Sequence, residues 1–290
     1  MFNPKTWPSA AFVLFTAAAL SGPAFAQGEE KPVAGEQDAA KEKKISTETA
    51  RELIEVSGVV RTSEEVLAQS TSAFDALPFL PEGFAERFRE EFDGEALDRD
   101  LTALIVEHVK PKAAASAIAF YSTESGQVWK ATMREIDEES FAQSQSLGEE
   151  LAMAIMSGTD VPPIPEREEP EEGSDEAKLQ SKLDEVLTLL KQRDIIQSVL
   201  ELSLEPLGEM GAPEELIDGL RRELNADRVL AILWPLLLER VDEKLLDDVL
   251  KWARTDDAQA FVANTVTLTP EATRIGQLAG QEAGERAMGG

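Results

Sequence analysis

The stretch Phe120 to Trp129, FYSTESGQVW, is the part of this 290-residue sequence that most resembles a reactive loop. Its hydroxyl residues and glycine could bind an anion at a helix N-terminus. However, no basic residue lies within the stretch, and helical patterns precede and follow it. We therefore interpret it as a corner between two helices. Phe120 and Tyr121 end the first helix, Thr123 caps the second, and Gly126 lets another backbone approach.

Other residue types offer little catalytic chemistry. His108 is the only histidine, and there is no cysteine, so His-rich zinc sites and the usual catalytic triads are not available. His108 lies on an apolar helix stripe, which favours a place at the edge of the core over a catalytic role with Glu107 or Asp100. The 56 acidic residues permit a carboxylate-dependent hydrolase, but close acidic pairs are expected on any helix of so acidic a chain. We predict no enzyme, no cofactor and no metal.

The formal net charge of −28 limits the class of partner. Nucleic acids and anionic lipids are bound by basic surfaces, so we exclude both. The expected partner is another periplasmic protein.

The N-terminal residues predict export. One lysine, an apolar run from Ala10 to Leu20 and the triplet Ala24-Phe25-Ala26 form a cleavable signal peptide over residues 1–26, with cleavage after Ala26. No later segment is long and apolar enough to span a membrane. Residues 27–43 are polar without apolar periodicity and are expected to form a disordered leader. The predicted location is the periplasm.

The remaining elements should all be helices. A helical pattern starts near Thr47, a cap is expected at Thr62 or Ser63, and Pro81 should open a helix with a phenylalanine stripe. No alternating pattern typical of a strand occurs, so the predicted class is all-α. Residues 158–176 contain several prolines and mostly acidic side chains, which predicts an extended linker.

An internal repeat divides the chain. Shifting the sequence by 132 positions places Pro81 on Pro213 and keeps prolines, caps and aromatic residues in phase for about fifty residues. Trp252 and Thr255 then correspond to Phe120 and Thr123. We predict a duplication, with one antiparallel helical domain at 44–157, a second, degenerate copy at 177–290, and packing of the two as a pseudo-dimer.

The corner also carries a resemblance. The pattern F-Y-x-[ST]-x-x-G after a short helix, in an exported chain, resembles the bacterial periplasmic domain of unknown function two-zero-five-nine family. Thr123 and Glu124 stand where members often have serine and proline. The second copy departs further, with Ala253 and Ala258 at the tyrosine and glycine positions. The resemblance implies a helical exported protein without an established reaction, and it supplies no catalytic residues.

Two binding functions follow from these features. The first is a protein-binding or scaffolding module, for which Trp129 and Trp234 are candidate binding residues, although core packing is the commoner role of a tryptophan. The second is a carrier of a small apolar ligand, if the Ala-rich segment Ala113 to Ala119 lines a cavity. In the second copy, large residues such as Leu245 and Leu246 would fill that space.

Overall fold

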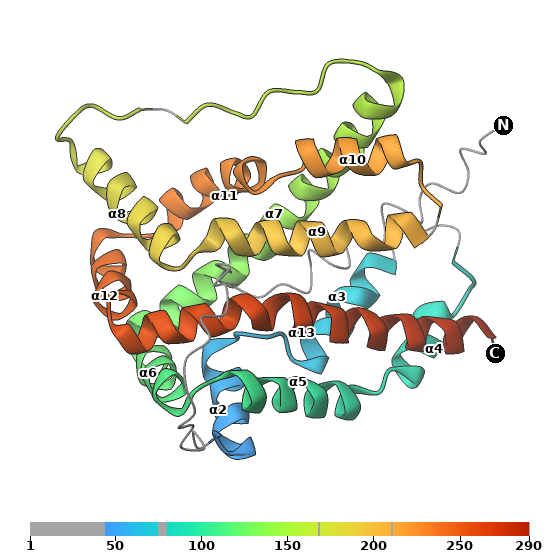
Figure 1. The fold of residues 1–290 in the computed structure, drawn as a ribbon, viewed down its shortest axis with the longest axis horizontal. Helices are drawn as coiled ribbons and strands as arrows, with labels where there is room; N and C mark the ends of the chain where they lie inside the picture. Colours follow the sequence, from blue (N-terminus) through green and yellow to red (C-terminus); the bar gives the residue numbers. More distant parts are fainter. Residues whose placement is uncertain (1–43, 75–79, 168, 210, 290) are drawn as a thin grey trace, which may run out of the picture.

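The computed structural model describes residues 44–74, 80–167, 169–209 and 211–289. These residues are all-α, as predicted, and contain no strand (Figure 1). The predicted signal peptide and leader lie outside the described residues. The helices are α2 (Thr47–Ser57), α3 (Ser63–Phe74), α4 (Phe84–Glu91), α5 (Gly94–His108), α6 (Pro111–Tyr121), α7 (Glu124–Ser157), α8 (Asp175–Leu189), α9 (Gln192–Glu209), α10 (Glu214–Glu223), α11 (Ala226–Arg240), α12 (Glu243–Ala253) and α13 (Asp256–Gly289).

Local sequence sets the helix starts. The predicted cap before α3 is a reciprocal capping box: the Thr62 N–H donates to Glu65 Oε2 at 2.9 Å, and the Glu65 N–H donates to Thr62 Oγ1 at 3.4 Å. The start of α4 differs from the prediction. This helix begins at Phe84 instead of beside Pro81, because Gly83 takes a left-handed conformation with φ 73° immediately before it.

The bounds of the later helices repeat along the chain. Helices α5, α6 and α7 begin and end 132 residues before α11, α12 and α13. Nearer the N-terminus the offset is 133. Gly58 ends α2 with φ 65°, and Lys191, the only described non-glycine residue with positive φ, follows α8 with φ 52°. We call residues 44–157 the first half and residues 175–289 the second half.

The two halves exchange their long helices. Helix α13 packs against α4, α5 and α6 of the first half, and α7 packs against α10, α11 and α12 of the second (Figure 1). The side chains agree with this. Leu151 of α7 lies in an apolar cluster with Leu216 and Leu220 of α10, while Ala283 and Ala287 of α13 lie with Phe84 and Phe88 of α4. The largest apolar cluster also contains residues of both halves. Each half therefore completes the core of the other.

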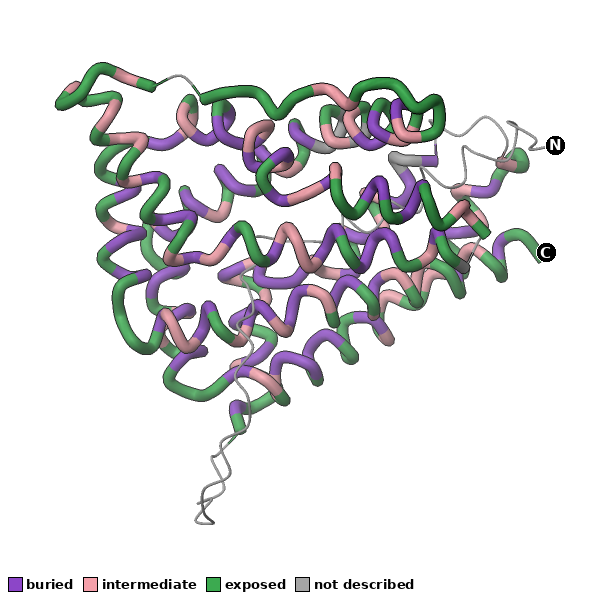
Figure 2. Tube along the Cα trace, turned by 45° about the horizontal axis from the view of Figure 1, so that its top comes forward, coloured by how far each residue is buried: buried purple, intermediate pink, exposed green. Residues whose placement is uncertain are grey.

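Residues 158–174 connect α7 to α8 without a helix or strand at any described position. Most of their side chains are exposed, whereas the helices turn buried residues inward (Figure 2). None of the described helices has the length and apolar character needed to cross a membrane.

Candidate functional site

The FYSTESGQVW stretch forms a helix corner. Thr123 Oγ1 accepts a hydrogen bond from the Gly126 N–H at 3.1 Å and donates one to the Phe120 carbonyl at 2.6 Å. A Cβ on Gly126 would lie 2.2 Å from that carbonyl oxygen, so the glycine permits the close approach. Thr255 repeats the cap in the second half, where its Oγ1 accepts from the Ala258 N–H at 3.2 Å and donates to the Trp252 carbonyl at 2.8 Å.

The two corners meet through their aromatic residues. Phe120 stacks on Trp252 with ring centroids 4.4 Å apart and planes at 5°. These are corresponding positions of the two halves. Trp252 Nε1 also donates to Ser116 Oγ at 3.2 Å, and Tyr121 packs edge-on against the same indole. Tyr121 is buried, and desolvation raises the pKa of its hydroxyl. The geometry is that of a packed internal contact.

The two tryptophans considered as binding residues lie inside the molecule. Trp129 is 0 % exposed in the core, which leaves its ring no surface for a partner from solution. Trp234 is 5 % exposed, and the guanidinium of Arg167 lies 3.8 Å from its ring centroid. Both therefore pack in the core, which is the commoner role of a tryptophan.

His108 takes part in a contact between the halves. Its Nε2 lies 3.4 Å from Glu271 Oε2 on α13. The corresponding pair in the second half joins Arg240 to Glu139 on α7. In each case the last residue of one helix, α5 or α11, contacts the long helix of the other half. His108 thus lies beside Glu271, a carboxylate at the contact between α5 and α13.

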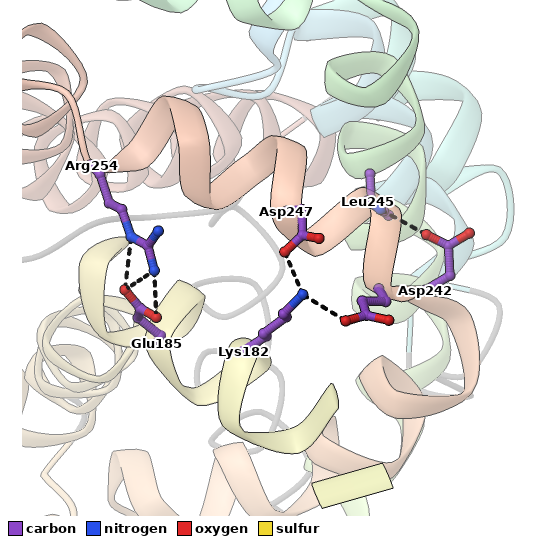
Figure 3. A network of polar contacts seen from close by, with 7 residues as sticks. Lys182, Glu185, Asp242, Leu245, Asp247 and Arg254 are labelled. Carbon is purple, nitrogen blue, oxygen red and sulfur yellow. Dashed lines mark hydrogen bonds and ion pairs between the residues drawn. The ribbon is translucent and has the colours of Figure 1, made fainter. Parts of the chain in front are cut away.

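A further polar network joins α8 to α12 (Figure 3). Lys182 Nζ contacts Asp247 at 2.5 Å and Glu243 at 2.8 Å, and two nitrogens of Arg254 bind Glu185 at 2.7–2.9 Å. The hydrogen bonds to Asp247 and Glu243 raise the pKa of Lys182. All these side chains reach solvent, so the network contributes little to stability.

A charged pocket of about 290 Å³ opens between α2, α3, α5 and α7 of the first half. It combines aliphatic and charged side chains. The residues that line it are Arg51, Ile54, Glu55, Gly58, Thr62, Glu65, Asp98, Leu101, Thr102 and Lys130. We refer to this cavity as the first-half pocket.

Most of the polar groups in the pocket have partners within the protein. Lys130 Nζ donates to the Glu55 carbonyl at 2.5 Å, at the C-terminal end of α2, and burial lowers its pKa. Asp98 accepts hydrogen bonds from the Ser63 N–H and hydroxyl at 2.9 and 2.7 Å. Arg51 differs from them, because its guanidinium has no hydrogen bond or ion pair with any described residue.

The corresponding region of the second half is largely apolar. Asp98, Thr102 and Lys130 correspond at the 132 offset to Leu230, Trp234 and Val262, all of which are buried. At the 133 offset of α2 and α8, Arg51 corresponds to Asp184 and Thr62 to Ile195. Asp184 binds Arg167 of the connecting segment at 2.9 Å.

Sequence reasoning missed this pocket. None of its lining residues belongs to the corner motif or to the candidate tryptophans. A single ungapped shift of 132 also misaligns α2 with α8 by one residue, which hides the reversal of charge between Arg51 and Asp184. The signal that could have found it is the change from polar to apolar residues between corresponding positions of α5 and α11.

A half-buried ion pair lies elsewhere on α7. Asp137 is 26 % exposed and contacts Arg61 Nη2 at 3.4 Å. Burial raises the pKa of Asp137 to about 6, although Arg61 opposes the shift.

No cluster of three or more histidine or acidic residues suited to a metal ion occurs in the described part of the chain. The chain matches no model of a protein family, no curated protein and no solved structure.

Proposed function

We propose that the protein is an exported, non-enzymatic binding module that contacts another protein through its first-half pocket. One observation carries the proposal. Two halves with the same order of helices differ at this place, where the first half has an open, charged cavity and the second has buried apolar residues under a connecting segment. A charged cavity costs stability compared with an apolar core, so its presence favours a role in recognition.

The contacts of the carboxylates favour binding over hydrolysis. A pair of catalytic acids needs one group to donate and one to accept a proton at the substrate. Of the three carboxylates in the pocket, Asp98 is held by Ser63 and Glu65 by Arg134 at 2.9 Å, which leaves Glu55 alone without a side-chain partner among the described residues. The carboxyl group with a raised pKa, Asp137, is paired with Arg61 and does not line the pocket.

The packing of α6 gives no support to a carrier of apolar ligands. Ala113, Ala114 and Ala117 are buried, and α6 packs against α2 and α13. The small side chains thus let helices approach closely. In the second half the large residues Leu245 and Leu246 occupy corresponding positions and are also buried.

We infer that the chain arose by duplication and forms a fused pseudo-dimer. The repeated helix bounds support this, as do corresponding hydrogen bonds. Gln127 Nε2 donates to the carbonyls of Val56 and Tyr121, and Gln259 Nε2 donates to those of Leu189 and Ala253. The exchange of α7 and α13 is the arrangement expected of an intertwined dimer whose subunits were joined.

Periplasmic location and membership of the domain of unknown function two-zero-five-nine family remain predictions. The first depends on the signal peptide at residues 1–26 and the second on the corner motif. Secretion is testable by fractionating cells that express the chain with and without residues 1–26.

Site-specific photo-crosslinking tests the proposed function. A photoreactive amino acid at Arg51, in the full chain in its native cells, should capture a discrete partner on illumination. The matched control places the same amino acid at Asp184, the corresponding and also exposed position of the second half, which binds Arg167 of the connecting segment. Capture at position 51 but not at 184 supports the proposal, and equal capture or none contradicts it.

A further inference from the structure

The second half shows how a chain segment sits on this module. Arg167, in the segment between α7 and α8, places its guanidinium over the Trp234 ring at 3.8 Å and binds Asp184 at 2.9 Å. Val161 of the same segment packs against the apolar cluster around Leu216. The segment is extended and Pro-rich, and it carries one cationic side chain into the place that corresponds to the first-half pocket.

The two contacts of Arg167 are made with residues that correspond to the pocket lining. Trp234 corresponds to Thr102, and Asp184 to Arg51. The first half therefore presents the opposite charge at the position that holds the segment in the second. It also replaces a ring that attracts cations with a small hydroxyl residue.

We propose that the first-half pocket binds an extended segment of a partner protein and that a carboxylate side chain of this segment pairs with Arg51. This inference rests on the proposed function and specifies its partner. Arg51 supplies a planar fork suited to a carboxylate, and it has no competing partner among the described residues. Lys130 Nζ, which spends one donor on the Glu55 carbonyl, adds a second positive charge to the lining.

The pocket also contains acidic side chains, which favour a partner segment of the opposite charge. Glu55, Glu65 and Asp98 also line it, and a cationic segment would be attracted to them. Asp98 already accepts two hydrogen bonds from Ser63, and Glu65 pairs with Arg134. Among the described residues, the Arg51 guanidinium and the Glu55 carboxylate are therefore the charged groups of the lining without a hydrogen bond or ion pair. The experiment therefore compares segments of both signs.

The connecting segment supplies the probes. Three fluorescent peptides copy residues 161–167, VPPIPER, with Glu166→Gln in all and glutamate, glutamine or arginine at the last position before a C-terminal amide. Binding to the full chain starting at Gln27 is measured by fluorescence anisotropy at physiological salt. We expect the glutamate peptide to bind about 2- to 30-fold tighter than the arginine peptide, because an exposed ion pair contributes about 0.2–1 kcal/mol and the reversed charge adds a repulsion of similar size.

Variants of the exposed Arg51 assign the preference to the pocket. Arg51→Gln should remove the difference in affinity between the glutamate and glutamine peptides. Arg51→Asp introduces the residue type found at Asp184 in the second half, and it should make the arginine peptide the tighter ligand. Arg222→Gln, an exposed substitution on α10, is the control and should change nothing. Equal binding of all peptides, or no effect of Arg51→Gln, overturns the proposed chemistry even if crosslinking at position 51 captures a partner.

A chain starting at Lys44 separates a partner from the acidic residues 27–43 of the same chain. If both chains bind the glutamate peptide equally, the pocket is open to a partner, as proposed. If the shorter chain binds more than fivefold tighter, residues 27–43 compete for the pocket and the proposal of a separate partner is overturned.

Discussion

The stacked pair Phe120 and Trp252 should couple the two halves energetically. Their ring centroids are 4.4 Å apart with planes at 5°, and both side chains are buried. Replacing either with leucine removes part of this contact and leaves a small cavity, which should lower the free energy of unfolding by about 1–3 kcal/mol. Because the stacking is lost already in each single variant, the double variant should lose less than the sum, by about 0.5–1.5 kcal/mol.

Urea denaturation followed by far-ultraviolet circular dichroism measures these free energies, provided that unfolding is a single transition. Phe88→Leu is the control, because Phe88 contacts Phe74 and Phe84 in a different cluster. Its effect should add to that of Trp252→Leu within about 0.5 kcal/mol. A coupling energy of zero between Phe120 and Trp252 would refute the reasoning that this contact joins the halves.

Three further predictions follow. Gly126→Ala should lower the urea midpoint by an amount equivalent to about 1–3 kcal/mol, because the Cβ meets the Phe120 carbonyl at 2.2 Å; an unchanged midpoint would show that the corner relaxes freely. Burial raises the pKa of Asp137 from 3.8 to about 6, so the folded chain binds more protons than the unfolded chain between these values and Asp137 lowers stability progressively as pH rises through them. The stability of Asp137→Asn relative to the native chain, measured in melts at pH 4 and pH 7, should therefore rise between these pH values by at most about 3 kcal/mol. A stability difference that is the same at both pH values would contradict the raised pKa. Cleavage at a protease site inserted between Glu171 and Glu172 should leave both fragments in one peak on size-exclusion chromatography, because α7 and α13 are exchanged, whereas independent domains would separate.

Patterns that depend on neighbours in sequence were predictable. The all-α class follows from apolar periodicity, and the caps at Thr62 and Thr123 follow from short side chains that accept amide hydrogens within the first turn. The repeat of 132 residues anticipated the matching bounds of α5 to α7 and α11 to α13. Each of these features involves residues a few positions apart or a comparison of the chain with itself.

The partners of the helices were not predictable in this way. The sequence suggested two helical domains at 44–157 and 177–290, but a helix with an apolar stripe buries it equally well against its own half or the other half. Only the tertiary structure places α13 on α4, α5 and α6. The same limit applies to Trp129 and Trp234, because the sequence does not distinguish an aromatic side chain that contacts a partner from one that packs in the core.

Sequence by itself determined the acidity and predicted the helices, their caps and the internal repeat, because these depend on local spacing and composition. Tertiary structure decided the exchange of the long helices and the site. Arg51, Asp98 and Lys130 come from three helices far apart along the chain, and only their packing brings them to one cavity. The proposed role of Arg51 likewise depends on a comparison with Asp184, its counterpart in the second half. Asp184 binds Arg167, a residue of the connecting segment.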